Sequence, residues 1–185
     1  MKNKQYFKQL RRYDPRFLIG IILVGIISLI FLFSFLKAFF VVVFFIGANT
    51  IFRFYKRFLP AVPLELEFIT FGSLFCAIEF GISAGIAVAI LGSLLADSAN
   101  GTINAYNFVM TIGYIIVALV GIFISPEHFI QAGITITVIY NIIIWSVFNF
   151  LLHHDLFKNT SYSITNVIFN YFLFTIIGSF ALSIV

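Results

Sequence analysis

The chain has 185 residues, of which 62% are hydrophobic and 10% are charged, and its mean hydropathy is +1.11. This composition leaves too little polar surface for a water-soluble protein, so it predicts an integral membrane protein and excludes a soluble enzymatic domain. The net charge of +4 does not indicate nucleic-acid binding, because six of the eleven basic residues precede the first hydrophobic span. Basic residues in that position are typical of the cytoplasmic side of a membrane.

The first elements expected are a basic cytoplasmic arm over residues 1–16 and then a single transmembrane helical domain over residues 17–185. The first membrane helix is predicted from Phe17 to Leu36, because its 20 uncharged residues span about 30 Å, the thickness of the hydrocarbon layer. A second apolar run follows Lys37 and ends at Phe52. One helix through both runs would be about 54 Å long. We therefore expect a turn near Lys37, the alternative being a second run that lies along the interface.

Hydrophobic segments with short polar breaks fill the rest of the chain. Pro60 and Pro63 predict a loop, because proline resists helix formation. The later spans are expected over residues 68–80, 82–96, 105–125, 129–152 and 163–185. The predicted fold class is thus all-α, a polytopic membrane bundle of six to seven transmembrane helices.

The positions of the basic residues favour seven crossings with a cytoplasmic amino terminus. In that arrangement ten of the eleven Lys and Arg side chains lie on the inner side of the membrane. If residues 38–58 do not cross, six spans remain, and Arg53, Lys56 and Arg57 fall on the outer side. The expected location is the plasma membrane, as a multi-pass protein.

Acidic residues are concentrated between Glu65 and Asn100. Glu65, Glu67 and Glu79 lie at or inside one apolar segment, and Asp97 ends the next. A carboxylate at membrane depth costs about 2.5 to 3.5 kcal/mol, so an acidic residue there is a hypothesis of function. In the alternative interpretation Glu65 and Glu67 lie among the lipid headgroups, and only Glu79 needs a buried partner.

Small residues recur in the same stretch at helical spacing. Gly81, Gly85 and Ala89 are four residues apart, and Gly92 extends the series. Small residues on one face of a membrane helix let a second helix approach closely. We predict that these four residues pack helices together.

Two stripes of amide side chains lie on apolar helices. Asn141, Trp145 and Asn149 share one helix face, and Asn166 and Asn170 are one turn apart on the last span. In hydrocarbon such groups must find partners, so they either bond neighbouring helices or line a polar cavity.

No motif for catalysis or metal binding is present. His153, His154 and Asp155 are adjacent, and no third spaced ligand accompanies them, so they are interpreted as a solvated loop. Phosphate-binding and nucleophile motifs are absent from the sequence. We therefore expect no enzyme, no catalytic residue, no metal and no cofactor.

The segment PLELEFITFGSLFCAIEFGISAGIAVAILGSLLAD resembles the substrate-binding (S) components of energy-coupling factor (ECF) transporters. The residues that carry the resemblance are Glu67-Phe68, Gly81, Gly85, Gly92 and Asp97. The resemblance implies a small helical membrane subunit that binds a vitamin or another micronutrient from outside. It also implies two kinds of partner, a transmembrane coupling subunit and ATPase subunits. The rod-shape-determining MreD family is similar at this level and implies a membrane scaffold instead.

The leading hypothesis is a substrate-binding membrane subunit of a micronutrient uptake transporter, with the lipid bilayer and an unknown small molecule as its other partners. The alternative is a scaffold or interaction protein without transport activity, in which the same polar groups only pack helices. The candidate pocket residues are Glu65, Glu67, Glu79, Asn141, Trp145, Asn149, Asn166 and Asn170.

Overall fold

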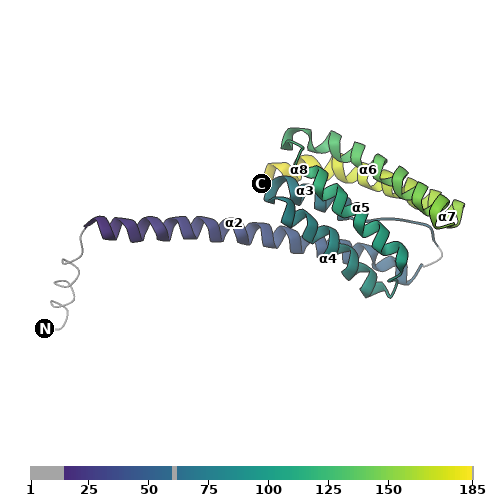
Figure 1. Cartoon of the computed structure of the whole chain (residues 1–185), viewed down its shortest axis with the longest axis horizontal. Coiled ribbons are helices and arrows are strands. Elements are labelled where there is room, and N and C mark those ends of the chain that lie inside the picture. Colours follow the sequence, from purple (N-terminus) through teal and green to yellow (C-terminus); the bar gives the residue numbers. More distant parts are fainter. Residues whose placement is uncertain (1–14, 60–61, 185) are drawn as a thin grey trace. The chain divides into compact units, whose positions relative to one another are not determined.

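The computed structural model describes residues 15–59 and 62–184, and over these residues helices, joined by loops, are the regular secondary structure (Figure 1). It divides between Lys37 and Ala38 into two compact units, the second of which extends to the carboxyl terminus. The predicted basic arm falls almost wholly outside the described residues, and a single domain over residues 17–185 stays a prediction. The α-helices are α2 (Pro15–Arg53), α3 (Ile69–Phe80), α4 (Ile82–Asn100), α5 (Ala105–Gly121), α6 (Phe129–Ser146), α7 (Leu156–Phe172) and α8 (Gly178–Ile184).

Helix α2 is continuous over 39 residues, so the turn that we expected near Lys37 is wrong. The nearest glycines are Gly25 and Gly47, no proline follows Pro15 within the helix, and lysine is a good helix former. The sequence at residue 37 therefore offers nothing that would break the helix, whatever the thickness of a bilayer. The described part of the helix starts at Pro15, and proline is compatible with the first turn of a helix.

The first two predicted spans form the single helix α2. The last predicted span corresponds to α7, η4 (Leu173–Ile177) and α8, which follow one another without a break, so the described residues form six continuous helices. Four helical segments are long and apolar enough to cross a membrane, namely Ile22–Arg57, Ile82–Asn100, Pro126–Leu151 and Leu156–Leu182. Helices α3 and α5 are apolar but shorter. The predicted all-α helical bundle is thus confirmed, and four of the helices in the described residues are long enough to cross a membrane.

Short helical segments extend or connect the α-helices. The 3₁₀ turn η1 (Phe54–Arg57) continues α2, and η2 (Pro126–His128) leads into α6. Two π-helical turns, η3 (Val147–Leu151) and η4 (Leu173–Ile177), follow α6 and α7. Helix α7 starts at Leu156, earlier than expected, because the Asp155 side chain accepts a hydrogen bond from the amide of Lys158 and caps the helix.

The small residues of α4 pack it against α3 and α5. A Cβ atom on Gly85 would lie 2.7 Å from both the Ala77 Cβ and the Ser73 carbonyl oxygen, so the helices touch at that glycine. Ala89 is fully buried, and Gly92 is buried on the same helix. Gly81 has a different role from the predicted one: its φ of 92° ends α3 and starts α4, and nothing lies within 4 Å of its Cβ position.

Phenylalanine rings form the apolar core. The ring of Phe71 lies 5.4 Å from that of Phe129 and 5.0 Å from that of Phe174, measured between centroids, and Phe45 of α2 contacts Phe71 as well. Gly133 of α6 lies directly against the Phe174 ring, which leaves no room for a side chain. Aromatic contacts thus join α2, α3, α6 and η4 into one unit.

Candidate binding cavity

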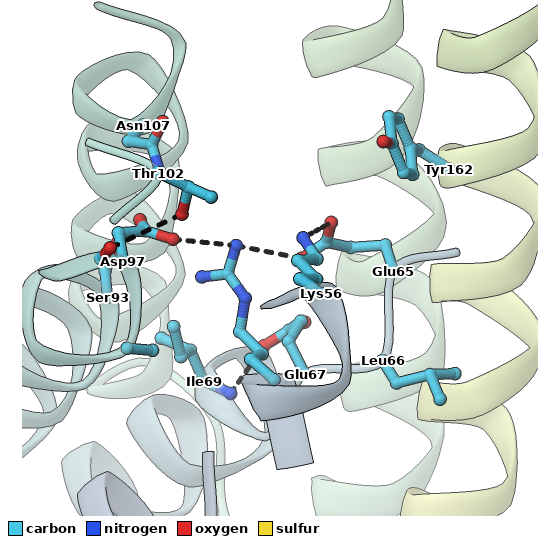
Figure 2. A network of polar contacts seen from close by, with 12 residues as sticks. Lys56, Glu65, Leu66, Glu67, Ile69, Ser93, Asp97, Thr102, Asn107 and Tyr162 are labelled. Carbon is cyan, nitrogen blue, oxygen red and sulfur yellow. Dashed lines mark hydrogen bonds and ion pairs between the residues drawn. The ribbon is translucent and has the colours of Figure 1, made fainter. Parts of the chain in front are cut away.

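The end of α2 brings a guanidinium between two carboxylates. Arg53 Nη2 lies 3.0 Å from Asp97 Oδ1 of α4 and 3.4 Å from Glu65 Oε1 of the loop before α3. Figure 2 draws these ion pairs, with Asp97 on one side of the network and Glu65 and Lys56 on the other. All three groups of the Arg53 cluster are at least 95% buried. The positive charge therefore ties α2, α4 and the loop together.

Lys56 of η1 makes a second ion pair with Glu65, through the other carboxylate oxygen. The loop that carries Glu65 is fixed at both sides, since Tyr55 donates a hydrogen bond to the Leu64 carbonyl and the Glu65 amide donates to Thr165 of α7. Burial alone would raise the pKa of Glu65, but the adjacent Lys56 and Arg53 more than offset this and hold the pKa below its usual range. Glu65 is therefore a carboxylate at neutral pH.

Glu67 is fully buried and makes no ion pair within residues 15–59 and 62–184. Its Oε2 accepts hydrogen bonds from the amides of Ile69 and Thr70, the first turn of α3, as a helix-capping carboxylate does. Its Oε1 accepts from the Thr70 hydroxyl and from two α7 amides, Asn166 and Asn170, each at 3.0 Å. Five donors thus satisfy the buried carboxylate, which indicates a structural role.

The two amide stripes predicted from the sequence do meet. Asn141 Nδ2 of α6 donates to Asn166 Oδ1 of α7 over 2.8 Å, and Asn166 in turn donates to Glu67. Asn170 completes the set through Glu67. Hydrogen bonds therefore run from α6 through α7 to the start of α3.

A cavity of about 280 Å³ lies beside these networks. Arg53 Nε and His154 Nδ1, two polar atoms of its lining, are buried without a hydrogen-bond partner among the described residues. Burying such an atom costs free energy unless a ligand or a water molecule forms a hydrogen bond with it. The polar lining residues include Arg53, Lys56, Glu65, Asn107, Tyr140, Asn141, His154, Lys158, Asn159 and Asn166.

The candidate pocket residues divide into three groups. Glu65, Asn141 and Asn166 line the cavity. Glu67 and Asn170 support it from behind through the hydrogen bonds described above.

Trp145, Asn149 and Glu79 lie elsewhere. Trp145 lies in the seam between α6 and α7, where its indole nitrogen donates to Thr160. The amide of Asn149, in the π turn η3, is buried without a partner in the described part of the chain. Glu79 is half-buried near the end of α3, makes no hydrogen bond or ion pair with any residue that the structure places, and does not line the cavity.

Sequence reasoning missed Arg53, Lys56, Asn107, Tyr140 and Asn159 as cavity residues. We had used Arg53 and Lys56 only as markers of membrane orientation. The signal that points to their role is their spacing, because basic residues at 53 and 56 and acidic residues at 65 and 67 flank one short loop. Opposite charges on the two sides of a loop are close enough to pair.

Comparisons with protein-family profiles, curated proteins and solved structures find no match to this chain. The cavity and its chemistry therefore carry the functional argument.

Proposed function

We propose that the chain is the substrate-binding membrane subunit of an uptake transporter for a small, micronutrient-like molecule, as the resemblance to ECF S components implies. The observation that supports this proposal most is the cavity, in which Arg53 Nε and His154 Nδ1 have no partner among the described residues. A scaffold gains nothing from such atoms, because apolar side chains of similar volume would pack there at lower cost. A bound polar ligand would satisfy them.

The size of the cavity limits the ligand. Binding sites for small molecules occupy about 300 to 1,000 Å³, so 280 Å³ is at the lower end. The part of a ligand that the cavity encloses is therefore small and polar.

The proposal includes partners and orientation. The chain has no phosphate-binding loop, so energy for transport would come from a transmembrane coupling subunit and ATPase subunits. The amino terminus would lie in the cytoplasm of a multi-pass plasma-membrane protein. Asn3→Cys in a Cys76→Ala background would then react with an impermeant thiol reagent only after permeabilisation, and ready labelling of intact cells would reverse the orientation.

The test of binding is ligand-induced thermal stabilisation of the purified chain across a panel of micronutrients. Tyr140→Phe should weaken the stabilisation by an active compound, because it removes a hydroxyl that lines the cavity. Tyr171→Phe is the matched control, because Tyr171 is 50% exposed and does not line the cavity.

The MreD-like scaffold is the second candidate, and a separate observation favours it. The bonds from Asn141 through Asn166 to Glu67 are complete within the chain, as helix packing alone requires. If no compound stabilises the protein, or if both tyrosine variants respond equally to every compound, the binding proposal fails and the scaffold interpretation takes its place.

A further inference from the structure

The pair of helices α6 and α7 has a second depression, which is almost entirely apolar. This groove, of about 430 Å³, is flanked by Val138 and Ile142 of α6 and by Ile164 and Ile168 of α7. The side chains of Ile142, Ile164 and Ile168 are each more than half exposed, so the groove is open to the surroundings of the bundle. In a membrane protein those surroundings include hydrocarbon chains.

The groove and the polar cavity share part of their lining. Asn141 and Ser163 border both, so the two spaces lie on either side of the same two side chains. The seam between α6 and α7 is held there by polar contacts: Trp145 Nε1 donates to Thr160 Oγ1 over 2.9 Å, and Asn159 donates to the Trp145 carbonyl over 3.0 Å. Individual side-chain hydrogen bonds between membrane helices contribute only about 0.6 kcal/mol on average, so this seam can open at low cost.

Two groups of the cavity lining favour an anion, the Arg53 Nε–H, which has no partner among the described residues, and the Lys158 ammonium. The lining includes three cations, Arg53, Lys56 and Lys158, and one carboxylate, Glu65. Glu65 pairs with both Arg53 and Lys56, and Asp97 pairs with Arg53 as well. Lys158 is exposed at the lining and has no carboxylate partner among residues 15–59 and 62–184. An anionic group entering the cavity would find this uncommitted charge, whereas a cation would be repelled by it.

We propose that the ligand is an anionic amphiphile from the bilayer, whose head occupies the polar cavity and whose hydrocarbon chain lies in the α6–α7 groove. This inference rests on the proposed binding function and names its substrate class. Because a bilayer is as apolar as the groove, the chain adds little affinity, and recognition comes from the head. The groove instead lets the ligand enter sideways through the seam.

The experiment uses the full chain in nanodiscs of phosphatidylcholine and a dodecyl phosphate that carries a diazirine at mid-chain. We expect saturable photolabelling of the peptides that contain residues 138–146 and 160–168. Ile168→Trp should reduce this labelling severalfold, because the larger indole side chain would occupy part of the groove. Ile116→Trp on α5 is the matched control, because the two isoleucines are 51% and 53% exposed and only Ile168 lines the groove.

The head is tested separately. Lys158→Glu should weaken labelling, and Arg57→Glu, at an exposed cation outside the cavity, should not. Competition by inorganic phosphate alone, at concentrations comparable to the probe, would show that a free anion is the ligand and overturn the amphiphile. Labelling spread over all exposed helices in proportion to their exposure would overturn it too.

The two proposals fail in different ways. If labelling is unspecific but a water-soluble compound stabilises the protein in a manner that depends on Tyr140, binding stands and the amphiphile is wrong. If neither result is obtained, both proposals are wrong.

Discussion

The bundle has an aromatic region, formed around the rings of Phe71, Phe129 and Phe174, and a polar region, formed around Arg53 and Glu65. The first is closely packed and the second contains a cavity. In the first, the rings of Phe71, Phe129 and Phe174 lie within 5.4 Å of one another by centroid, and Gly133 leaves the Phe174 ring no free space. In the second, Arg53 and Glu65 line an open cavity of about 280 Å³. Helix α6 takes part in both, since Phe129 at its start packs in the aromatic region and Tyr140 and Asn141 further along line the cavity.

The aromatic region contributes to the stability of the fold, whereas a polar region is not required for stability. Membrane helices associate through close packing and small residues, which the aromatic region supplies. A buried ion cluster adds little stability relative to apolar residues of the same volume. The cavity is the feature that the proposed binding function addresses, and the variants below test the division between packing and polar regions in order of expected effect.

The largest effect is expected for Arg53→Met. Removal of the guanidinium leaves Asp97 buried without a cation, and breaking a buried pair in this way costs about 3 to 5 kcal/mol. The free energy of unfolding, measured by thermal or denaturant unfolding in a mild detergent, should fall by that amount. Arg57→Met is the control, because Arg57 is exposed, and it should behave as the parent protein.

The cluster can also be removed as a unit. The double variant Arg53→Met, Asp97→Leu should recover part of the lost stability, because no uncompensated charge remains on that side of the network. Equal stability of Arg53→Met and the parent protein would contradict the burial of this cluster.

The next largest effect concerns helix packing. Gly85→Ala should lower stability by about 1 to 3 kcal/mol, since its Cβ would overlap a backbone oxygen that cannot move aside. Gly47→Ala in α2 is the control, because nothing lies within 4 Å of its Cβ position and alanine favours the helix. Matching melting temperatures for the two variants would show that α3, α4 and α5 are less tightly packed than described.

The fold was predictable where local chemistry decides it. Gly81 separates α3 from α4, at the boundary expected between residues 80 and 82. The turn at Lys37 was wrong because it rested on bilayer thickness, and no residue there disfavours the helix.

The site was only partly predictable, for a different reason. Amides at i and i+4 had to find partners, and Asn141 and Asn166 did find each other. Arg53 contacts Asp97, 44 positions away, and such a pairing depends on how the helices cross, which periodicity does not determine. The i+4 spacing also predicted that Asn149 shares a helix face with Asn141 and Trp145. This prediction assumed a regular α-helix, whereas Asn149 lies in the π turn η3, which changes the helical register.

The third prediction uses pH. The pKa of Glu65 in the folded protein is lowered, so the carboxylate stabilises the fold above the unfolded pKa, about 4.3 for a glutamate. This contribution is lost as the pH falls through the lower, folded pKa. Stability of the parent protein should therefore decrease steeply from pH 5 downwards, and Glu65→Gln should flatten that part of the curve.

The control for the pH experiment is Glu127→Gln. The Glu127 side chain is 75% exposed, and its contact with His128 is weak at the surface, so its loss should leave the curve unchanged. An identical pH profile for Glu65→Gln and the parent protein would show that Glu65 is not ionised within the cluster.

The smallest effect, and one of opposite sign, is expected for Asn149→Leu. Both polar atoms of the Asn149 amide are buried without partners among the described residues, so an apolar side chain of similar size should be neutral or stabilise the protein by up to about 1 kcal/mol. Asn166→Leu is the contrasting variant, because it breaks the bonds to Asn141 and Glu67 and leaves the Glu67 carboxylate short of a donor. Its stability should fall by about 1 to 3 kcal/mol. The melting temperatures of the two variants are compared in the same detergent. If Asn149→Leu lowers stability as much as Asn166→Leu, the π turn holds a partner for the Asn149 amide. The polar region would then extend beyond the cavity into η3.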